Sequence, residues 1–256
     1  MNEIGVSFLS CDILSRKKIC EDIFIEISDF AMPDRIADGH EILKSVTEKI
    51  NIRCIQAPIR DWKTEAMDEN FRQLTLKKTK EHIDLASENN VERIIFFSSY
   101  DQLVKLISYD EMWLNNNIRF WKEVAEYAEK KNVICMYCNV WDCKPDLMRN
   151  LFDAVNSDYF KFAFDIGHAF YAGKEPAEVW IDKLHSYIDY VCVHDNNGDF
   201  DAHLQIGQGK IKIRETIEYI RKYRDDLLYC LQFFDNNGFE HSLLLMNEYV
   251  RLKWRK

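Results

Sequence analysis

Five acidic and imidazole side chains in one short stretch of the sequence have the types and spacing of a metal site. They are Asp165, His168, His194, Asp201 and His203. Asp201 and His203 are two residues apart, so in an extended segment their side chains point to the same side. A tight turn at Gly167 would let Asp165 and His168 face one point. Carboxylate and imidazole groups together suit zinc, manganese or iron, so we expect a divalent metal cofactor.

Each of these residues also has an ordinary structural interpretation. A single histidine at the end of a strand is usually a hydrogen-bonded structural residue, and a loop aspartate usually caps a turn. What favours a joint function is the grouping of five such residues near predicted strand ends. The strands and loops that carry these five residues therefore decide between a shared metal site and separate structural roles.

Short apolar runs alternate with segments of helical period along the whole chain. The predicted strands are Ile4–Leu9, Ile23–Ile27, Ile52–Ala57, Arg93–Phe97, Val133–Cys138, Phe160–Asp165, Tyr190–His194 and Leu227–Phe233. The predicted helices include Ser15–Asp22, Phe71–Glu88, Ile118–Lys130, Lys144–Val155, Pro176–Tyr187, Arg214–Tyr223 and Phe239–Trp254. Eight alternating units predict an α/β fold, a single (β/α)8 barrel that forms one domain over residues 1–256.

In such a barrel the carboxyl ends of the strands meet at one mouth, where the site lies. The residues that end strands there are Glu26, Gln56, Ser98, Cys138, Asp165, His194 and Gln232. Small residues lie two positions before several of them, for example Cys192 before His194 and Ala163 before Asp165. Because alternate residues share a face, this pattern predicts a packed interior below a polar mouth.

The composition narrows the class of protein. The chain has 256 residues, 47% of them apolar, and a net charge of −9, which argues against a nucleic-acid partner. Neither an export signal nor an apolar run long enough to cross a membrane is visible, so we expect a cytoplasmic protein without membrane attachment. Most of the eight cysteines lie in apolar runs, and we expect reduced thiols.

The three segments around the acidic and imidazole residues resemble the xylose-isomerase-like TIM barrel superfamily. It contains sugar and sugar-phosphate isomerases and epimerases, and metal-dependent apurinic endonucleases. Its members share Asp-x-Gly-His after the sixth strand, a His that ends the seventh strand, and Asp-x-His followed by a Gly-x-Gly-like run. The matching segments here are Asp165-Ile-Gly-His168, Val193-His194-Asp195 and Asp201-Ala-His203, the last followed by Gly207-Gln-Gly209.

The resemblance implies roles for these residues. Asp165 and His194 match two ligands of the central metal of the superfamily. His168, Asp201 and His203 match positions that hold an additional zinc in the endonuclease branch. In the epimerase branch, the position of His168 contacts the substrate instead.

The chain departs from the family pattern at two catalytic positions. Cys138 stands where the fifth strand usually has Glu, and Gln232 stands where the eighth strand usually has Glu. A glutamine cannot act as a carboxylate base, whereas a cysteine could bind zinc as a thiolate or act as a base. The endonuclease histidines after strands three and four are also missing, because Gln56 and Ser98 or Ser99 occupy those places.

Further residues are candidates for substrate binding. They are Glu26, Gln56, Trp113, Asn139 and Lys210. Glu26 could bind a sugar hydroxyl or pair with a base at the mouth. Trp113, in a predicted loop, could stack on a sugar ring, although aromatic residues at a mouth are often only packing. Lys210 could contact a phosphate or hydroxyl, although an exposed lysine is usually only solvated.

Three functions fit this pattern. The first is a metal-dependent sugar or sugar-phosphate isomerase or epimerase. In it Cys138, Asp165, His194 and Gln232 hold one metal in an altered site, and the candidate catalytic residues are Cys138, His168 and Gln232. The second is a zinc-dependent phosphoesterase that resembles the endonucleases. The third is a non-catalytic barrel that only binds a ligand. All three imply a small-molecule partner, a sugar or sugar phosphate for the first, and similar barrels are often homo-oligomers.

Overall fold

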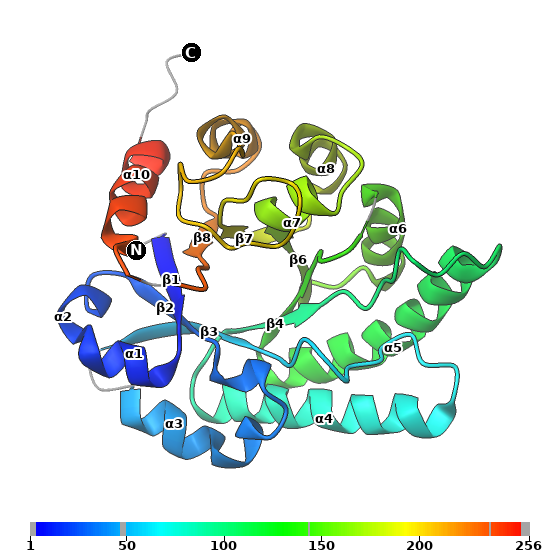
Figure 1. The fold of residues 1–256 in the computed structure, drawn as a ribbon. Helices are drawn as coiled ribbons and strands as arrows, with labels where there is room; N and C mark the ends of the chain where they lie inside the picture. The colour runs from blue at the N-terminus through cyan, green and yellow to red at the C-terminus, as the bar shows by residue number, and fades with distance from the viewer. Residues whose placement is uncertain (1–3, 47–49, 143, 236, 252–256) are drawn as a thin grey trace.

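Eight parallel strands close into a barrel in the computed structural model, which describes residues 4–46, 50–142, 144–235 and 237–251 (Figure 1). Each strand pairs with its neighbours in sequence, and β1 pairs with β8 to close the ring. The strands are β1 Ile4–Phe8, β2 Phe24–Ile27, β3 Asn51–Gln56, β4 Arg93–Phe97, β5 Ile134–Cys138, β6 Phe160–Asp165, β7 Ile188–Val193 and β8 Leu228–Leu231. The predicted strands agree with these bounds to within two residues at each end, and the (β/α)8 prediction is confirmed.

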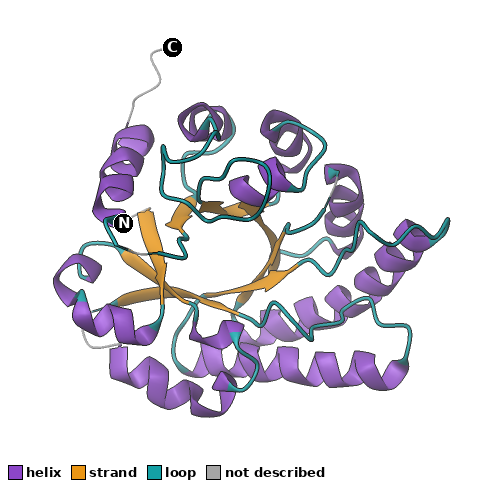
Figure 2. Cartoon of the chain, viewed as in Figure 1, coloured by secondary structure: helices purple, strands orange, loops and turns teal. Residues whose placement is uncertain are grey.

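Helices surround the ring of strands on the outside (Figure 2). They are α1 Ser10–Ser15, α2 Lys17–Cys20, α3 Gly39–Val46, α4 Glu69–Glu88, α5 Tyr109–Lys131, α6 Pro145–Val155, α7 Ile166–Tyr171, α8 Ala177–Leu184, α9 Ile213–Ile220 and α10 Phe239–Arg251, with 3-10 turns at Asp29–Ala31 and Arg35–Asp38. The predicted first helix is wrong in form, because two short helices replace it. No described helix combines the length and apolar character that crossing a bilayer requires.

The interior of the barrel is lined with small side chains, as the alternation along the strands predicts. Its buried cluster contains Cys54, Cys138, Ala163, Cys192 and Cys230, together with Phe24, Tyr190 and a few aliphatic residues. A separate and larger apolar cluster lies between the strands and the helices. Within the described residues the cysteines carry free thiols. The small interior residues leave room for polar side chains in the layer above them.

The single domain over residues 1–256 and the cytoplasmic location remain predictions from the sequence. Residues 1–3 and 252–256, at the two ends of the predicted domain, lie outside the described residues. The barrel itself is sufficient to place the residues of the candidate site, since every one of them lies in the described part of the chain.

Candidate functional site

Three histidines and one aspartate meet at the carboxyl ends of β6 and β7. One ligand atom from each of His168, His194, Asp201 and His203 lies within 4.8 Å of the others, and we call this group the histidine cluster. His168 belongs to α7, and His194 directly follows β7. Asp201 and His203 lie in the long loop between β7 and α9, which runs beside α7 in Figure 1. The structure thus brings four of the five residues of the predicted metal site together.

The three imidazoles converge on the carboxylate of Asp201. The Nε2 atoms of His168 and His203 each lie 3.2 Å from an oxygen of Asp201. The Nε2 atom of His194 lies 4.0 Å from Oδ1 of Asp201. The rings of His194 and His203 stack with their centroids 3.7 Å apart. All three Nε2 atoms thus face the same small volume.

Backbone carbonyl groups accept hydrogen bonds from the Nδ1 atoms of two of the imidazoles and fix the orientation of these rings. Nδ1 of His168 donates to the carbonyl of Asn139 at 2.8 Å, and Nδ1 of His203 donates to the carbonyl of Gln232 at 2.9 Å. A proton on Nδ1 leaves the Nε2 lone pair free, and this arrangement is typical of histidines that bind metals. His203 has a positive φ of 45°, a conformation that non-glycine residues rarely adopt.

Asp165 lies next to the histidine cluster and is fully buried. Its Oδ1 accepts hydrogen bonds from the backbone N–H of His168 at 2.8 Å and from Nε2 of His194 at 3.0 Å. The first of these caps α7, which begins directly after β6. Asp165 therefore joins the start of the helix to the imidazole on the neighbouring strand.

Gly167 serves a different purpose from the one expected. It lies inside α7 rather than in a turn, so the predicted turn is wrong. A Cβ atom at this position would lie 2.0 Å from Cε1 of His194. The position requires glycine because the imidazole of His194 packs directly against the helix backbone.

The long loop that carries Asp201 and His203 is held by the carboxylate of Asp195. Its two oxygens accept four backbone N–H groups, at distances between 2.9 and 3.0 Å, from Asn196, Gly207, Gly209 and Ile211. Backbone hydrogen bonds of 2.8 Å also join Asp195 to Leu204 in both directions. Asp195 was not assigned a role from the sequence, although its place between His194 and the glycine run was visible.

The electrostatics of the cluster favour a cation. Burial lowers the pKa of His168, but the carboxylates of Asp165 and Asp201 outweigh burial and raise this pKa well above its usual value. Burial raises the pKa of Asp201, but the histidines outweigh it and hold this pKa far below its usual range. The pKa of Asp165 is lowered for the same reason, because its histidine neighbours outweigh burial. Burial lowers the pKa of His194. The two carboxylates therefore stay ionised.

Several buried atoms in this region have no hydrogen-bond partner. They are Oδ2 of Asp165, Oδ1 of Asp201 and Nδ1 of His194. Oδ1 of Asp201 lies close to His203, but not with the geometry of a hydrogen bond. Unpaired buried acceptors are costly unless a ligand or ion satisfies them. Three imidazoles and a carboxylate are a donor set that fits zinc or a similar divalent metal.

A second polar group lies across the mouth, around the buried carboxylate of Glu26. Its Oε1 accepts hydrogen bonds from Nε2 of Gln56 at 2.6 Å and from Nε2 of Gln232 at 2.7 Å. Its Oε2 accepts one from the hydroxyl of Tyr190 at 2.9 Å. We call these four residues the glutamine floor. Glu26 has no cationic partner among the described residues, and burial raises its pKa.

Cys138 ends β5 and Asn139 directly follows it, and both side chains make contacts within the protein. Cys138 is fully buried, and its thiol donates to the carbonyl of Asn139 at 3.4 Å. Its sulfur also lies within 4.8 Å of ligand atoms of Asp165 and His168. The side chain of Asn139 pairs with the backbone of Asp165, donating to its O at 3.0 Å and accepting from its N–H at 2.9 Å. Both polar ends of Asn139 are therefore used within the protein.

Two residues proposed for substrate binding lie away from both groups. Trp113 is in α5 rather than in a loop, so its predicted placement is wrong, and it is fully buried against Tyr100 and Tyr137. Lys210 is exposed, and its backbone N–H donates to the carbonyl of Asn196. The structure brings neither side chain into the histidine cluster or the glutamine floor.

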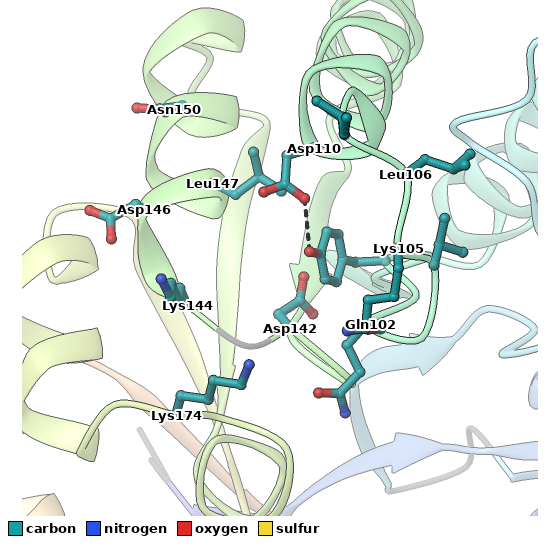
Figure 3. A pocket seen from close by; sticks show the side chains of 13 residues that line it. Gln102, Lys105, Leu106, Asp110, Asp142, Lys144, Asp146, Leu147, Asn150 and Lys174 are labelled. Atoms are coloured by element: carbon teal, nitrogen blue, oxygen red, sulfur yellow. Dashed lines mark hydrogen bonds between the residues drawn. The ribbon is translucent and has the colours of Figure 1, made fainter.

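A cavity of about 500 Å³ lies apart from these two groups, and no residue of the histidine cluster or the glutamine floor lines it (Figure 3). Loops after β4, β5 and α7 surround it, and its lining includes Lys105, Lys144 and Lys174. Asp142 points into it and is held by the hydroxyl of Ser98 at 2.8 Å and the N–H of Val140 at 3.0 Å. Burial raises the pKa of Asp142 to about 6. The sequence did not reveal this cavity, because its residues come from loops without a repeating pattern.

The fold agrees with a comparison to known proteins. The family described as xylose isomerase-like TIM barrel matches residues 24–249, and the chain belongs to this family. The uncharacterized protein MJ1311 of Methanocaldococcus jannaschii is 28% identical over 208 residues, which cover 77% of this chain and 70% of MJ1311.

Two solved structures cover almost the whole chain. A D-tagatose 3-epimerase-like protein is 27% identical with a TM-score of 0.79, over 97% of each chain. The TTHB071 protein from Thermus thermophilus, solved after soaking with ZnCl2, is 18% identical with a TM-score of 0.81, over 96% of this chain and 97% of its own. The second likeness shows the fold alone.

Proposed function

We propose that the protein is a metal-dependent isomerase or epimerase of a sugar or sugar phosphate. The observation that carries this proposal is the convergence of three Nε2 atoms on the carboxylate of Asp201, beside unpaired buried acceptors. The similarity to a D-tagatose 3-epimerase-like protein supports a sugar as the substrate class. The sugar, or its phosphate, is the small-molecule partner.

The proposed ligands of the ion are His194, Asp201 and His203, with Asp165 beside them. A divalent ion bound there would polarise neighbouring oxygens of an α-hydroxy carbonyl compound and so acidify the adjacent C–H bond. We assign the substrate contact to His168, because its Nδ1 is fixed by a carbonyl and its side chain is slightly exposed at the mouth. Gln232 has no acid–base function, and Cys138 is fully buried, so His168 is the proposed proton carrier.

The metal content of the purified protein tests the first half of the proposal. We expect about one equivalent of a transition metal in the wild type, and less than a tenth of that in His194→Ala and His203→Ala. His241→Ala, which removes an exposed histidine on α10, is the matched control and should keep the metal. A wild-type protein that takes up no metal under any condition would leave only the non-catalytic barrel.

Deuterium exchange tests the second half and does not require the product to be identified. Ketoses and ketose phosphates are incubated with the protein in D2O, and incorporation at the carbon next to the carbonyl is followed by NMR. We expect exchange with at least one of them, reduced at least 100-fold in His168→Gln. If no ketose exchanges while the metal is bound, the isomerase proposal fails.

A metal-dependent phosphoesterase is the second candidate function. It is favoured by the meeting of His168, Asp201 and His203, the three residues that resemble the additional zinc site of the endonuclease branch. Hydrolysis of bis-p-nitrophenyl phosphate by the zinc-loaded protein, lost in His203→Ala, would support it over the isomerase. The net charge of −9 argues for a small phosphoester rather than DNA as the substrate.

A further inference from the structure

The glutamine floor is a polar network that the proposed metal chemistry does not use. Glu26 is 0% exposed, whereas Gln56 and Gln232 are 8% and 5% exposed. The carboxylate therefore lies beneath two amide groups that reach the surface of the mouth. A buried acid surrounded only by neutral donors is expensive, so its retention calls for a physical reason.

The hydrogen bonds fix the orientation of both amide groups. Both Nε2 atoms donate to the same oxygen of Glu26, Oε1. The other oxygen, Oε2, contacts the hydroxyl of Tyr190. If Glu26 is ionised, both of its oxygens only accept. If it is protonated, the proton lies on Oε2 and Oε1 still accepts from both amides. The amide nitrogens therefore point toward Glu26 in either state.

This orientation turns the two amide oxygens away from Glu26. Among the described residues, no donor is hydrogen-bonded to Oε1 of Gln56 or to Oε1 of Gln232, and neither oxygen is a fully buried unpaired atom. Ser7 is the other polar side chain beside Gln56, with its hydroxyl 3.4 Å from Nε2 of that residue. The mouth thus presents two carbonyl-type oxygens, one from Gln56 and one from Gln232.

We propose that Gln56 and Gln232 form a subsite that binds the hydroxyl groups of a polyol chain, and that Glu26 is the positioning residue that turns both amide oxygens toward this subsite. Two neighbouring hydroxyls donate to the two amide oxygens. A phosphate or carboxylate group only accepts, so it cannot donate to these oxygens, and their partial negative charge repels it. An anionic end of the substrate is therefore excluded from this side of the mouth. The inference rests on the proposed function only for the claim that the ligand is a substrate.

The test uses D-sorbitol and D-gluconate, two unreactive probes that differ in one terminal group, a hydroxymethyl or a carboxylate. Binding is measured by calorimetry on the full chain after EDTA treatment, so that neither metal nor catalysis contributes. We expect the wild type to prefer D-sorbitol over D-gluconate by about fivefold or more, the equivalent of one hydrogen bond. A wild type that binds no D-sorbitol up to 100 mM (about the weakest affinity of interest) overturns the inference.

Substitutions of the two glutamines test the acceptor atoms. Gln56→Met and Gln232→Met keep the length of the side chain and remove the amide oxygen, so each should weaken D-sorbitol binding about fivefold. The matched control is Gln73→Met, since Gln73 also donates to a glutamate, Glu69, but on the exposed face of α4. Gln73→Met should bind D-sorbitol like the wild type. Unchanged affinity in both floor variants contradicts the proposed subsite.

Glu26→Met tests the positioning role with a readout that a purely structural residue would not change. The new side chain keeps the length but has no oxygen to accept from the two amide nitrogens, so the amides are no longer held with their oxygens toward the mouth and can present N–H groups there. The preference for D-sorbitol over D-gluconate should fall about tenfold, whereas Tyr190→Phe, which leaves both amides facing Oε1, should keep it within twofold. An unchanged preference in Glu26→Met removes the role of Glu26. Loss of isomerase activity alone affects none of these measurements, so the two proposals fail separately.

Discussion

The histidine cluster and the glutamine floor lie on two sides of one barrel mouth, and they differ in whether their buried polar atoms are hydrogen-bonded. In the histidine cluster, buried acceptor atoms lack partners and three imidazole nitrogens converge on a carboxylate. In the glutamine floor, Glu26 accepts from both amides and from Tyr190, and the two amide oxygens remain available. The first side leaves buried acceptors unpaired, whereas the buried carboxylate of the second side is paired within the protein. The comparison contrasts the side that we propose to bind an ion with the side that we propose to select the ligand.

Gln232 joins the two sides through different atoms. Its backbone carbonyl accepts from Nδ1 of His203, and its side chain donates to Glu26. A substitution of its side chain therefore changes the glutamine floor and leaves the anchor of His203 in place. This separation makes the comparison testable, since each side has a residue that can be changed without touching the other.

The largest effect is expected from Gly167→Ala, which acts on the histidine cluster. The added methyl group would overlap the ring of His194, and helix and strand would have to separate. We expect a loss of about 3 kcal/mol of unfolding free energy and loss of the bound metal. Urea unfolding and metal analysis measure the two effects.

Gly207→Ala is the control for this substitution. Gly207 also lies near the cluster and has a positive φ of 87°, but an added Cβ would meet no atom within 4 Å. It should lose only about 1 kcal/mol, the strain of the left-handed conformation, and keep its metal. If both variants lose metal equally, close packing against His194 is not what distinguishes Gly167.

The second prediction concerns Gln232→Glu, which restores the residue usual in the family. It would place a second carboxylate about where an amide now donates to Glu26 at 2.7 Å, so two buried acids would repel each other. We expect a loss of about 2–3 kcal/mol at pH 7.5. The repulsion raises the pKa of one acid, so stability is lost as pH rises through that value and is regained at low pH.

A second substitution tests whether repulsion between the two carboxylates explains this loss of stability. Adding Glu26→Gln to Gln232→Glu exchanges the acid and the amide between β2 and β8, and should restore stability to within about 1 kcal/mol of the wild type. Urea unfolding of the four proteins of this cycle provides the measurement. Strictly additive losses would mean that the two side chains do not interact, against the hydrogen bond between them.

Asn139→Ala should have an intermediate effect, and it acts on the histidine cluster alone. It would remove the side-chain partners of the buried backbone N–H and carbonyl of Asp165, a loss of about 2 kcal/mol. We also expect zinc affinity to fall about tenfold or more, because Asp165 loses its support, although the backbone carbonyl that accepts from His168 remains. D-Sorbitol binding should not change. Asn150→Ala, on the exposed face of α6, is the control for both measurements.

The histidine cluster could be predicted from the sequence because its residues follow two successive strands closely. Asp165 and His194 end predicted strands, and closing a barrel brings such ends together. The same argument placed Glu26, Gln56 and Gln232 at the mouth, but the hydrogen bonds of the glutamine floor could not be predicted, because they depend on side-chain direction. Tyr190 was named only as the start of a predicted strand.

Two local interpretations failed for physical reasons. Gly167 was assigned to a turn, since a sequence shows local backbone needs but not the approach of a distant ring such as that of His194. The start of α5 was missed because its buried face includes Asn117, a polar residue that interrupts the apolar pattern. The structure shows why it is there: its side-chain oxygen accepts from Thr64 and Trp121. In both cases, a tertiary contact decided the residue type.

The smallest effect is expected at Asp142, in the wall of the cavity that the loops after β4, β5 and α7 surround. Its pKa is raised to about 6 from an ordinary value near 3.8, chiefly by burial. The folded protein therefore holds this proton more tightly than the unfolded chain, and stability falls as pH rises from about 4 to about 6. Asp142→Asn should abolish this part of the pH dependence, about 1–2 kcal/mol. Urea unfolding of both proteins at pH 4.5 and pH 7.5 measures it, and the difference between them cancels the titration of other groups. A parallel pH dependence in the two proteins would show that Asp142 is already ionised at the lower pH. The charge of Asp142 would then not lower the free energy of unfolding, in contrast to the second carboxylate that Gln232→Glu adds to the glutamine floor.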